Sequence, residues 1–214
     1  MTSRQLTASR PGAIPRPRWP SDGLTAMAMK KRGRDPATLA MRRLVKKLEK
    51  ADIPHAVMGG MAVYAHGHQR LTADVDVLVT PEGLQTFRQR FVPRYYEPVA
   101  GRNRRFVDRV NGVTLDLLVT GRFPGRGHPG PIAFPNPLQV RQQIDDIYYV
   151  DLVTMIQLKL AARRHQDFAD VVNLITVHNL DESFLDSLHA SVRQDFVECL
   201  EEKRREDEYL AREG

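Results

Sequence analysis

The feature that most constrains the fold is the run LTADVDVLV at residues 71–79, where two aspartates alternate with valines. Alternation with a period of two is typical of a β-strand, so Asp74 and Asp76 project from one face while the valines turn to the other, toward a core. Two carboxylates this close repel each other unless a cation lies between them. The run therefore predicts a strand whose polar face binds a cation.

A second apolar run, VTLDLLV at residues 113–119, carries a third acid, Asp116, in the same setting. It follows the dipeptide Asn111-Gly112, which predicts a hairpin with a two-residue turn. We expect the Asp116 carboxylate about 4–7 Å from those of the other two acids if the three share a metal, because metal–oxygen distances are about 2 Å. Hard oxygen ligands of this kind favour Mg²⁺ or Mn²⁺.

A glycine pair, Gly59 and Gly60, lies between a predicted short strand at 54–58 and a predicted short helix at 61–67. Glycine allows the backbone to approach a ligand closely, and the first turn of a helix presents free amides. We therefore expect the pair to cradle the phosphates of a nucleotide.

In combination, GGMAVYAHGHQRLTADVDVLV at residues 59–79 resembles the signature of the DNA polymerase β-like nucleotidyltransferase superfamily, with Asp116 matching its third acid. A finer similarity is to small prokaryotic nucleotidyltransferases of the AbiEii abortive-infection toxin type. Residues 70–76 resemble their Arg-x-Thr-x-Asp-x-Asp motif, and residues 157–175 are similar to their Lys-x-x-Ala plus Asp-x-x-Asp element. The resemblance covers residues 54–178.

The resemblance implies an α/β fold, with a small mixed-sheet nucleotidyltransferase core, flanking helices and a helical C-terminal part. It implies Mg²⁺- or Mn²⁺-dependent transfer of a nucleoside monophosphate from an NTP such as ATP to an acceptor hydroxyl on RNA, for example tRNA, or on a protein side chain. A toxin role beside a cognate antitoxin is also implied. The catalytic, metal-holding residues would be Asp74, Asp76 and Asp116. The nucleotide-binding residues would be Gly59, Gly60, Arg70, Thr72 and Lys159.

Other interpretations remain open. One is a catalytically silent nucleotide- or RNA-binding regulatory module of the same fold, and another is a metal-stabilised structural domain, which leaves the glycine pair unexplained. Asp167 and Asp170 lie three residues apart on one predicted helix, near Arg163 and Arg164, so ion pairing is the favoured interpretation for them. The arginines between positions 88 and 109 are expected to form a solvated face, and the alternative is that they steer an RNA or a nucleotide.

The net charge of +6 belongs entirely to the N-terminus, since residues 1–36 hold eight lysines and arginines against two acids. We predict a disordered basic tail at residues 1–34, without a role in the site, then the nucleotidyltransferase core at 35–150 and a helical region packed on it at 151–214. The single Cys199 excludes a disulfide framework. No apolar run approaches the roughly 20 residues of a membrane span, so we expect a cytoplasmic protein.

Overall fold

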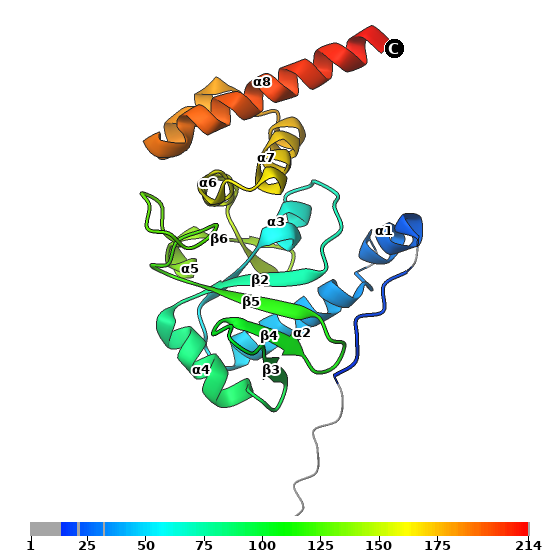
Figure 1. Cartoon of the computed structure of the whole chain (residues 1–214), viewed down its shortest axis with the longest axis vertical. Coiled ribbons are helices and arrows are strands. Elements are labelled where there is room, and N and C mark those ends of the chain that lie inside the picture. The colour runs from blue at the N-terminus through cyan, green and yellow to red at the C-terminus, as the bar shows by residue number, and fades with distance from the viewer. Residues whose placement is uncertain (1–13, 21, 32, 214) are drawn as a thin grey trace, which may run out of the picture.

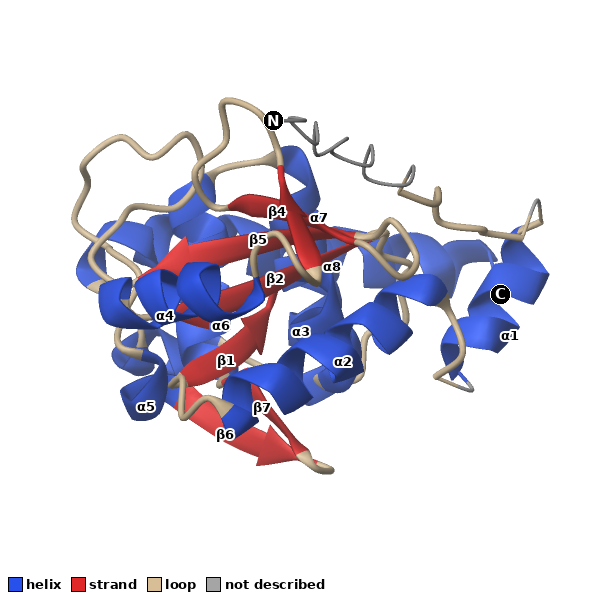
Figure 2. Ribbon diagram, turned by 90° about the horizontal axis from the view of Figure 1, so that it is seen from below, coloured by secondary structure: helices blue, strands red, loops and turns tan. Residues whose placement is uncertain are grey.

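The computed structural model describes residues 14–20, 22–31 and 33–213. Its centre is a seven-stranded mixed sheet in the order β3-β4-β5-β2-β1-β7-β6, with helices on both sides (Figure 1, Figure 2). The strands are β1 (His55–Met58), β2 (Asp74–Val79), β3 (Tyr96–Pro98), β4 (Arg105–Asp108), β5 (Thr114–Val119), β6 (Arg141–Ile144) and β7 (Ile147–Val150). The predicted mixed α/β fold class is thus confirmed.

The helices fall into two groups around the sheet. In Figure 1, α6, α7 and α8 stack above α3, while α2 and α4 lie below β2. Their bounds are α1 (Gly23–Lys31), α2 (Pro36–Lys50), α3 (Gly59–Ala65), α4 (Pro81–Phe91), α5 (Pro137–Val140), α6 (Leu152–Ala162), α7 (His165–His178), the 3₁₀-helix η1 (Glu182–Ser187) and α8 (Ala190–Glu213). Within the described part of the chain, no helix combines the length and apolar character needed to cross a membrane.

Helix α2 begins where the sequence places its start. The Asp35 side chain caps it by accepting a hydrogen bond from the Thr38 amide at 3.0 Å, and Pro36 occupies the first turn. Leu44 and Leu48 lie on its buried face, without exposed surface. This face packs against the sheet, so α2 covers the core on one side of it.

The two central strands, β2 and β5, pair in parallel over their full length. Val75, Val77, Leu115 and Leu117 are fully buried on the core face, whereas the aspartates between them are only partly buried. The predicted division of faces is therefore confirmed for both strands.

The hairpin between β4 and β5 is present, but the predicted two-residue turn is wrong. The Asp108 amide donates to the Val113 carbonyl at 2.8 Å, and the Gly112 amide donates back to the Asp108 carbonyl at 2.7 Å, so four residues form the loop. The Asn111 side chain donates to the Pro36 carbonyl at 2.8 Å. This contact joins the loop to the first turn of α2, and no local turn signal in the sequence indicates it.

Three further differences concern segments around the site. Strand β2 begins at Asp74 and not at residue 71, so Arg70 and Thr72 lie in the preceding loop and not on the strand. Strands β3 and β6 form at the sheet edges without having been predicted, because short edge strands carry little periodic signal.

The predicted disorder of the basic tail is wrong for residues 23–31, which form α1. Ala26 is 4% exposed, and Trp19, just upstream, packs against the core. Pro15 also touches the β4–β5 loop, because a Cβ added to Gly112 would lie 1.8 Å from the Pro15 carbonyl oxygen. Residues 1–13 of that prediction lie outside the described residues.

Candidate functional site

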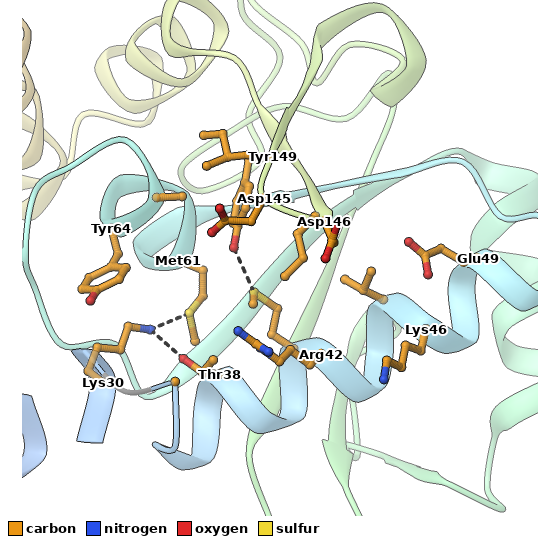
Figure 3. A pocket seen from close by; sticks show the side chains of 16 residues that line it. Lys30, Thr38, Arg42, Lys46, Glu49, Met61, Tyr64, Asp145, Asp146 and Tyr149 are labelled. Atoms are coloured by element: carbon orange, nitrogen blue, oxygen red, sulfur yellow. Dashed lines mark hydrogen bonds between the residues drawn. The ribbon is translucent and has the colours of Figure 1, made fainter. Parts of the chain in front are cut away.

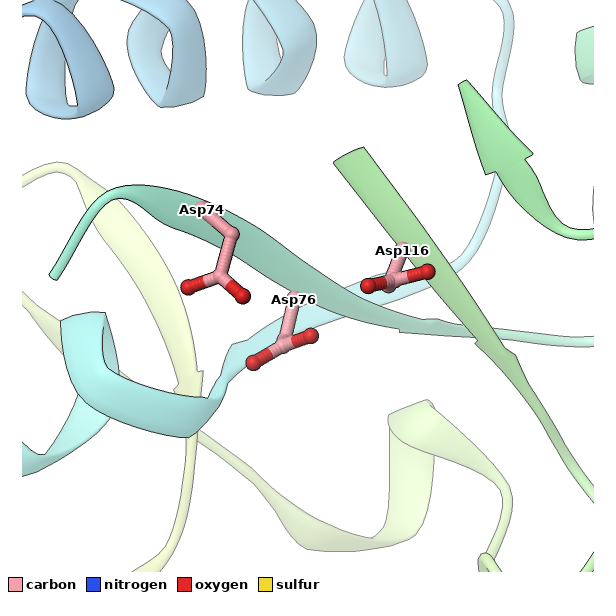
Figure 4. Close-up of side chains that lie close together, drawn as sticks. All are labelled: Asp74, Asp76 and Asp116. Atoms are coloured by element: carbon pink, nitrogen blue, oxygen red, sulfur yellow. The ribbon is translucent and has the colours of Figure 1, made fainter. Parts of the chain in front are cut away.

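Three carboxylates meet on the polar face of β2 and β5. The parallel register places Asp76 directly beside Asp116, and Asp74 lies two residues before Asp76 on the same face. One oxygen from each lies within 4.8 Å of the others, and Figure 4 shows all three side chains pointing to the same side of the sheet. The predicted convergence of these acids is confirmed, and a cluster of this kind could bind a divalent metal ion.

Asp76 is the electrostatically strained member of the cluster. Burial, together with the charges of Asp74 and Asp116, raises its pKa to about 7, although Arg164 and Lys159 oppose the shift. No donor among the described residues makes a hydrogen bond with its carboxylate. A buried carboxylate without a donor favours either a bound proton or a bound cation.

The other two carboxylates have partners. The Thr72 hydroxyl donates to Asp74 Oδ1 at 2.9 Å, so Thr72 orients this side chain. Arg105, the cross-strand neighbour of Asp116, donates to both of its oxygens, from Nε at 2.8 and 3.2 Å and from Nη2 at 2.6 Å. A cation that binds Asp116 therefore shares this carboxylate with Arg105 or displaces the guanidinium.

The two predicted glycines lie against the site for a steric reason. Gly59 has φ +60°, and a Cβ there would lie 2.0 Å from Asp76 Oδ2. A Cβ on Gly60 would lie 2.7 Å from the Thr72 Cβ. Both positions therefore require glycine so that Asp76 and Thr72 can approach the start of α3. Their contact with phosphate stays a prediction.

The remaining predicted residues, Arg70 and Lys159, belong to a buried network of charges. Asp170 accepts hydrogen bonds from Arg70 Nη1 at 2.7 and 2.5 Å and from Lys159 Nζ at 2.6 Å. Lys159 also bonds to Asp167 at 3.1 Å, and Asp167 in turn pairs with Arg164 at 2.6 Å. The network joins the loop before β2 to α6 and α7.

The ion pairs expected for this region are only partly correct. The predicted pairing of Asp167 with Arg164 is confirmed. The predicted pairing of Arg163 with these acids is wrong, because that side chain bonds to Asp195 on α8 at 2.8 Å. Neither arginine at 163–164 pairs with Asp170 among the described contacts, since this carboxylate is turned toward Arg70, which is distant in sequence.

A cavity of about 540 Å³ opens on the carboxylates. Gly59, Asp76, Asp116 and Lys159 line it, so four of the eight predicted site residues surround one space. The surrounding arginines are Arg102, Arg104, Arg105, Arg126 and Arg164. Sequence reasoning assigned the first three to a solvated face and gave the fourth no role, because spacing along the chain does not indicate that two loops meet at one cavity.

A different cavity, of about 620 Å³, lies between α2, α3 and the β6–β7 hairpin and contains none of the three acids. Figure 3 shows Lys30 at its edge, with Nζ bonded to Met61 Sδ at 2.7 Å and to Thr38 Oγ1 at 3.3 Å. Burial lowers the pKa of Lys30, and Asp35 partly offsets this effect. This cavity is larger than the one at the carboxylates. It is not the candidate site, because metal chemistry needs the grouped carboxylates.

No protein-family model and no curated protein sequence matches the chain. Among solved structures, an antigenic nucleotidyltransferase-like protein from Paracoccidioides brasiliensis is similar at 18% identity and a TM-score of 0.48, over 76% of this chain and 86% of that one. A protein from H. pylori described as a candidate nucleotidyltransferase is similar at 18% identity and a TM-score of 0.43, over 80% of this chain and 78% of that one. These likenesses are too distant to bear on activity.

Proposed function

We propose that the chain is a nucleotidyltransferase that depends on a divalent metal and moves a nucleoside monophosphate from an NTP to an acceptor hydroxyl, with release of pyrophosphate. The observation that carries the proposal is the group of three carboxylates within 4.8 Å, one of which has a raised pKa and no hydrogen-bond donor. The sequence resemblance around Gly59 and the Asp-x-Asp run supports the same activity.

The residues present fit Mg²⁺ or Mn²⁺. All three side chains offer hard oxygen ligands, and Asp74 and Asp76 have no cationic partner among the described residues. When bound, such an ion would lower the pKa of the attacking hydroxyl and neutralise charge on the triphosphate. To bind this ion, Asp116 would exchange its contact with Arg105 for one with the cation.

The protein's own residues would then divide the work. Asp74 and Asp76 would hold the nucleotide's cation, and Asp116 would accept the proton of the acceptor hydroxyl. Arginines at the cavity rim supply positive charge for the triphosphate, which carries several negative charges. Thr72 acts through Asp74 as a positioning residue. Lys159 lines the same cavity and adds positive charge near the carboxylates.

For the acceptor we propose RNA such as tRNA, or a protein side chain, in agreement with the AbiEii-type resemblance. A role as the toxin of a toxin–antitoxin or abortive-infection pair, with a cognate antitoxin and a cytoplasmic location, belongs to the same proposal. The silent nucleotide-binding module remains the second candidate, because the pairing of Asp116 with Arg105 describes a site in which one carboxylate is already neutralised.

The test incubates the purified chain with each α-phosphate-labelled NTP, Mg²⁺ and either total RNA or a protein extract, and follows the label. We expect metal-dependent transfer that Asp76→Asn and Asp116→Asn abolish. Asp186→Asn, at an exposed acid on η1, is the matched control and should transfer normally.

Two other outcomes have defined meanings. Binding of Mg²⁺ and NTP without transfer to either acceptor class would support the silent module. A chain that binds neither metal nor NTP would overturn both candidates.

A further inference from the structure

A third, smaller pocket of about 330 Å³ lies between the N-terminal segment and the loop that leads into β2. Trp19, Gly23 and Ala26 form one wall, and residues 71–73 form the other. Figure 1 shows α1 beside the loop that joins α3 to β2. The sequence indicated no role in the site for the N-terminal segment.

One residue links this pocket to the carboxylates. Thr72 lines the pocket, and its hydroxyl donates to Asp74 Oδ1 at 2.9 Å. The 540 Å³ cavity is lined by Asp76 and Asp116 themselves. One space therefore opens on two of the carboxylates, and the other adjoins the third through its hydrogen-bond partner Thr72.

The two spaces differ in chemistry. The cavity at Asp116 is rimmed by arginines, which suits phosphates. The pocket at Thr72 is lined by the Trp19 indole, the Leu71 side chain and alanines, and among its described lining residues only Asp22 is charged. Asp22 Oδ1 already accepts a hydrogen bond from the Thr25 amide at 2.7 Å, as a helix cap. A polyphosphate has no partner there.

We propose that the Thr72 pocket receives the base of the nucleotide substrate, with Trp19 as the surface on which the base stacks. This inference rests on the proposed nucleotidyltransferase activity and names the group that its site recognises beyond the phosphates. A planar base has an apolar face that an indole covers well, and every base offers such a face. The N-terminal segment is then a nucleotide-binding element and not a tail.

The chain carries a built-in probe for this contact, because Trp19 is its single tryptophan. The experiment titrates the full chain, with Mg²⁺ and without acceptor, against each NTP, against inorganic triphosphate, against free nucleoside and against a short RNA oligonucleotide. Tryptophan fluorescence reports on the pocket, and calorimetry reports total binding. We expect saturable quenching by NTP, and binding of inorganic triphosphate without quenching.

Variants separate stacking from folding. Trp19→Ala should weaken NTP binding by about tenfold, the scale of losing one base–aromatic stack, and should leave inorganic triphosphate binding unchanged. Trp19→Phe keeps an aromatic face and should keep most of the affinity. Leu71→Ser alters the opposite wall and should also weaken NTP binding. Leu24→Ser, at an 88% exposed position on α1 outside the pocket, is the control and should have no effect.

The outcomes are distinguishable. Unchanged NTP affinity in Trp19→Ala, or equal quenching by inorganic triphosphate and NTP, would overturn the base pocket while leaving the transferase intact. Quenching by the oligonucleotide alone would assign the pocket to the acceptor and overturn its assignment to the nucleotide. If neither triphosphate nor NTP binds, the proposed function fails and this inference fails with it.

Discussion

Asp76 and Asp116 are direct partners in the parallel pairing of β2 with β5. Because side chains alternate between the faces of a sheet, a slip of one residue would turn Asp116 toward the core and divide the cluster. The buried residues on the opposite face, among them Val77 and Leu117, hold the register because a slip would expose them. The candidate metal site is therefore specified by the packing of the core behind it.

Gly59 is predicted to be essential for the position of Asp76. In Gly59→Ala, the new Cβ would lie 2.0 Å from Asp76 Oδ2, so the carboxylate must move. We expect metal binding to be lost, with a stability loss of about 1–3 kcal/mol from the backbone conformation and the clash. Calorimetric titration with Mg²⁺ and denaturant unfolding measure the two effects.

The control for this variant is Gly101→Ala. Gly101 has φ +69°, similar to Gly59, but a Cβ there meets nothing within 4 Å. It should show only the stability loss that comes from the backbone conformation, which is smaller than that of Gly59→Ala, and it should keep metal binding. Normal Mg²⁺ affinity in Gly59→Ala would refute the link between this glycine and the carboxylate.

The raised pKa of Asp76 predicts a pH dependence with a definite sign. Its pKa is about 7 in the folded chain and 3.8 as a free side chain. The folded state thus holds the proton more tightly, and this contribution to stability is complete below the unfolded pKa and lost as the pH rises through 7. In the absence of metal, the free energy of unfolding of Asp76→Asn, relative to that of the natural sequence, should rise by about 2 kcal/mol from about pH 5 to about pH 8.

Denaturant unfolding at both pH values, with and without Mg²⁺, checks this prediction. The metal should reduce the gain, because a bound cation stabilises the ionised carboxylate. A difference between the two proteins that does not change with pH would mean that Asp76 is already ionised.

Arg105 is predicted to compete with metal for Asp116. The guanidinium bonds to both oxygens, and its side chain is 44% exposed, so solvent weakens the pair. Arg105→Ala should tighten binding of Mg²⁺ alone by up to about fivefold, in line with an exposed ion pair of about 1 kcal/mol. Arg102→Ala removes an arginine from the same cavity without breaking an ion pair and serves as the control. Equal affinities in the two variants would exclude this competition.

The sequence predicted the parts of the site that depend on local periodicity. The alternation in residues 71–79 placed Asp74 and Asp76 on one face of their strand, because a strand repeats every two residues. The alternation in residues 113–119 separated Asp116 from the core residues of its own strand, but the register that brings it beside Asp76 comes from the structure. The hairpin was also predictable from Asn111-Gly112, although its loop length was not. Asn111 also contacts Pro36, a residue 75 positions earlier, and neighbouring residues do not indicate such a contact.

Contacts between distant segments were beyond the reach of the sequence. Arg70 bonds to Asp170, 100 positions later, so neither its location in a loop nor its partner follows from neighbouring residues. The packing of Trp19 against the core was missed because its segment is rich in proline and arginine, a composition that favours disorder. Tertiary contacts determine the structure of such segments, and the periodicity of the sequence does not reveal these contacts.

Asp170 is predicted to be the most sensitive ionic residue outside the three acids. Its side chain is fully buried and accepts hydrogen bonds from Arg70 and Lys159. Burial raises its pKa, but the charges of these two partners, together with their hydrogen bonds, outweigh burial and leave the pKa below its usual value. Asp170→Asn keeps the shape and removes the charge, so Arg70 loses its buried counter-ion. We expect a loss of about 3–5 kcal/mol, the scale of breaking a buried pair.

Denaturant unfolding measures this loss, and the pH adds a second check. A carboxylate whose folded pKa is depressed stabilises the fold above its unfolded pKa and ceases to do so as the pH falls, so the difference between Asp170→Asn and the natural sequence should shrink in acid. Glu182→Gln breaks the exposed pair with Arg204 and should change stability by less than about 1 kcal/mol. Similar losses in both variants would show that the buried network contributes no more than a surface ion pair, and that Arg70 is held in place by packing alone.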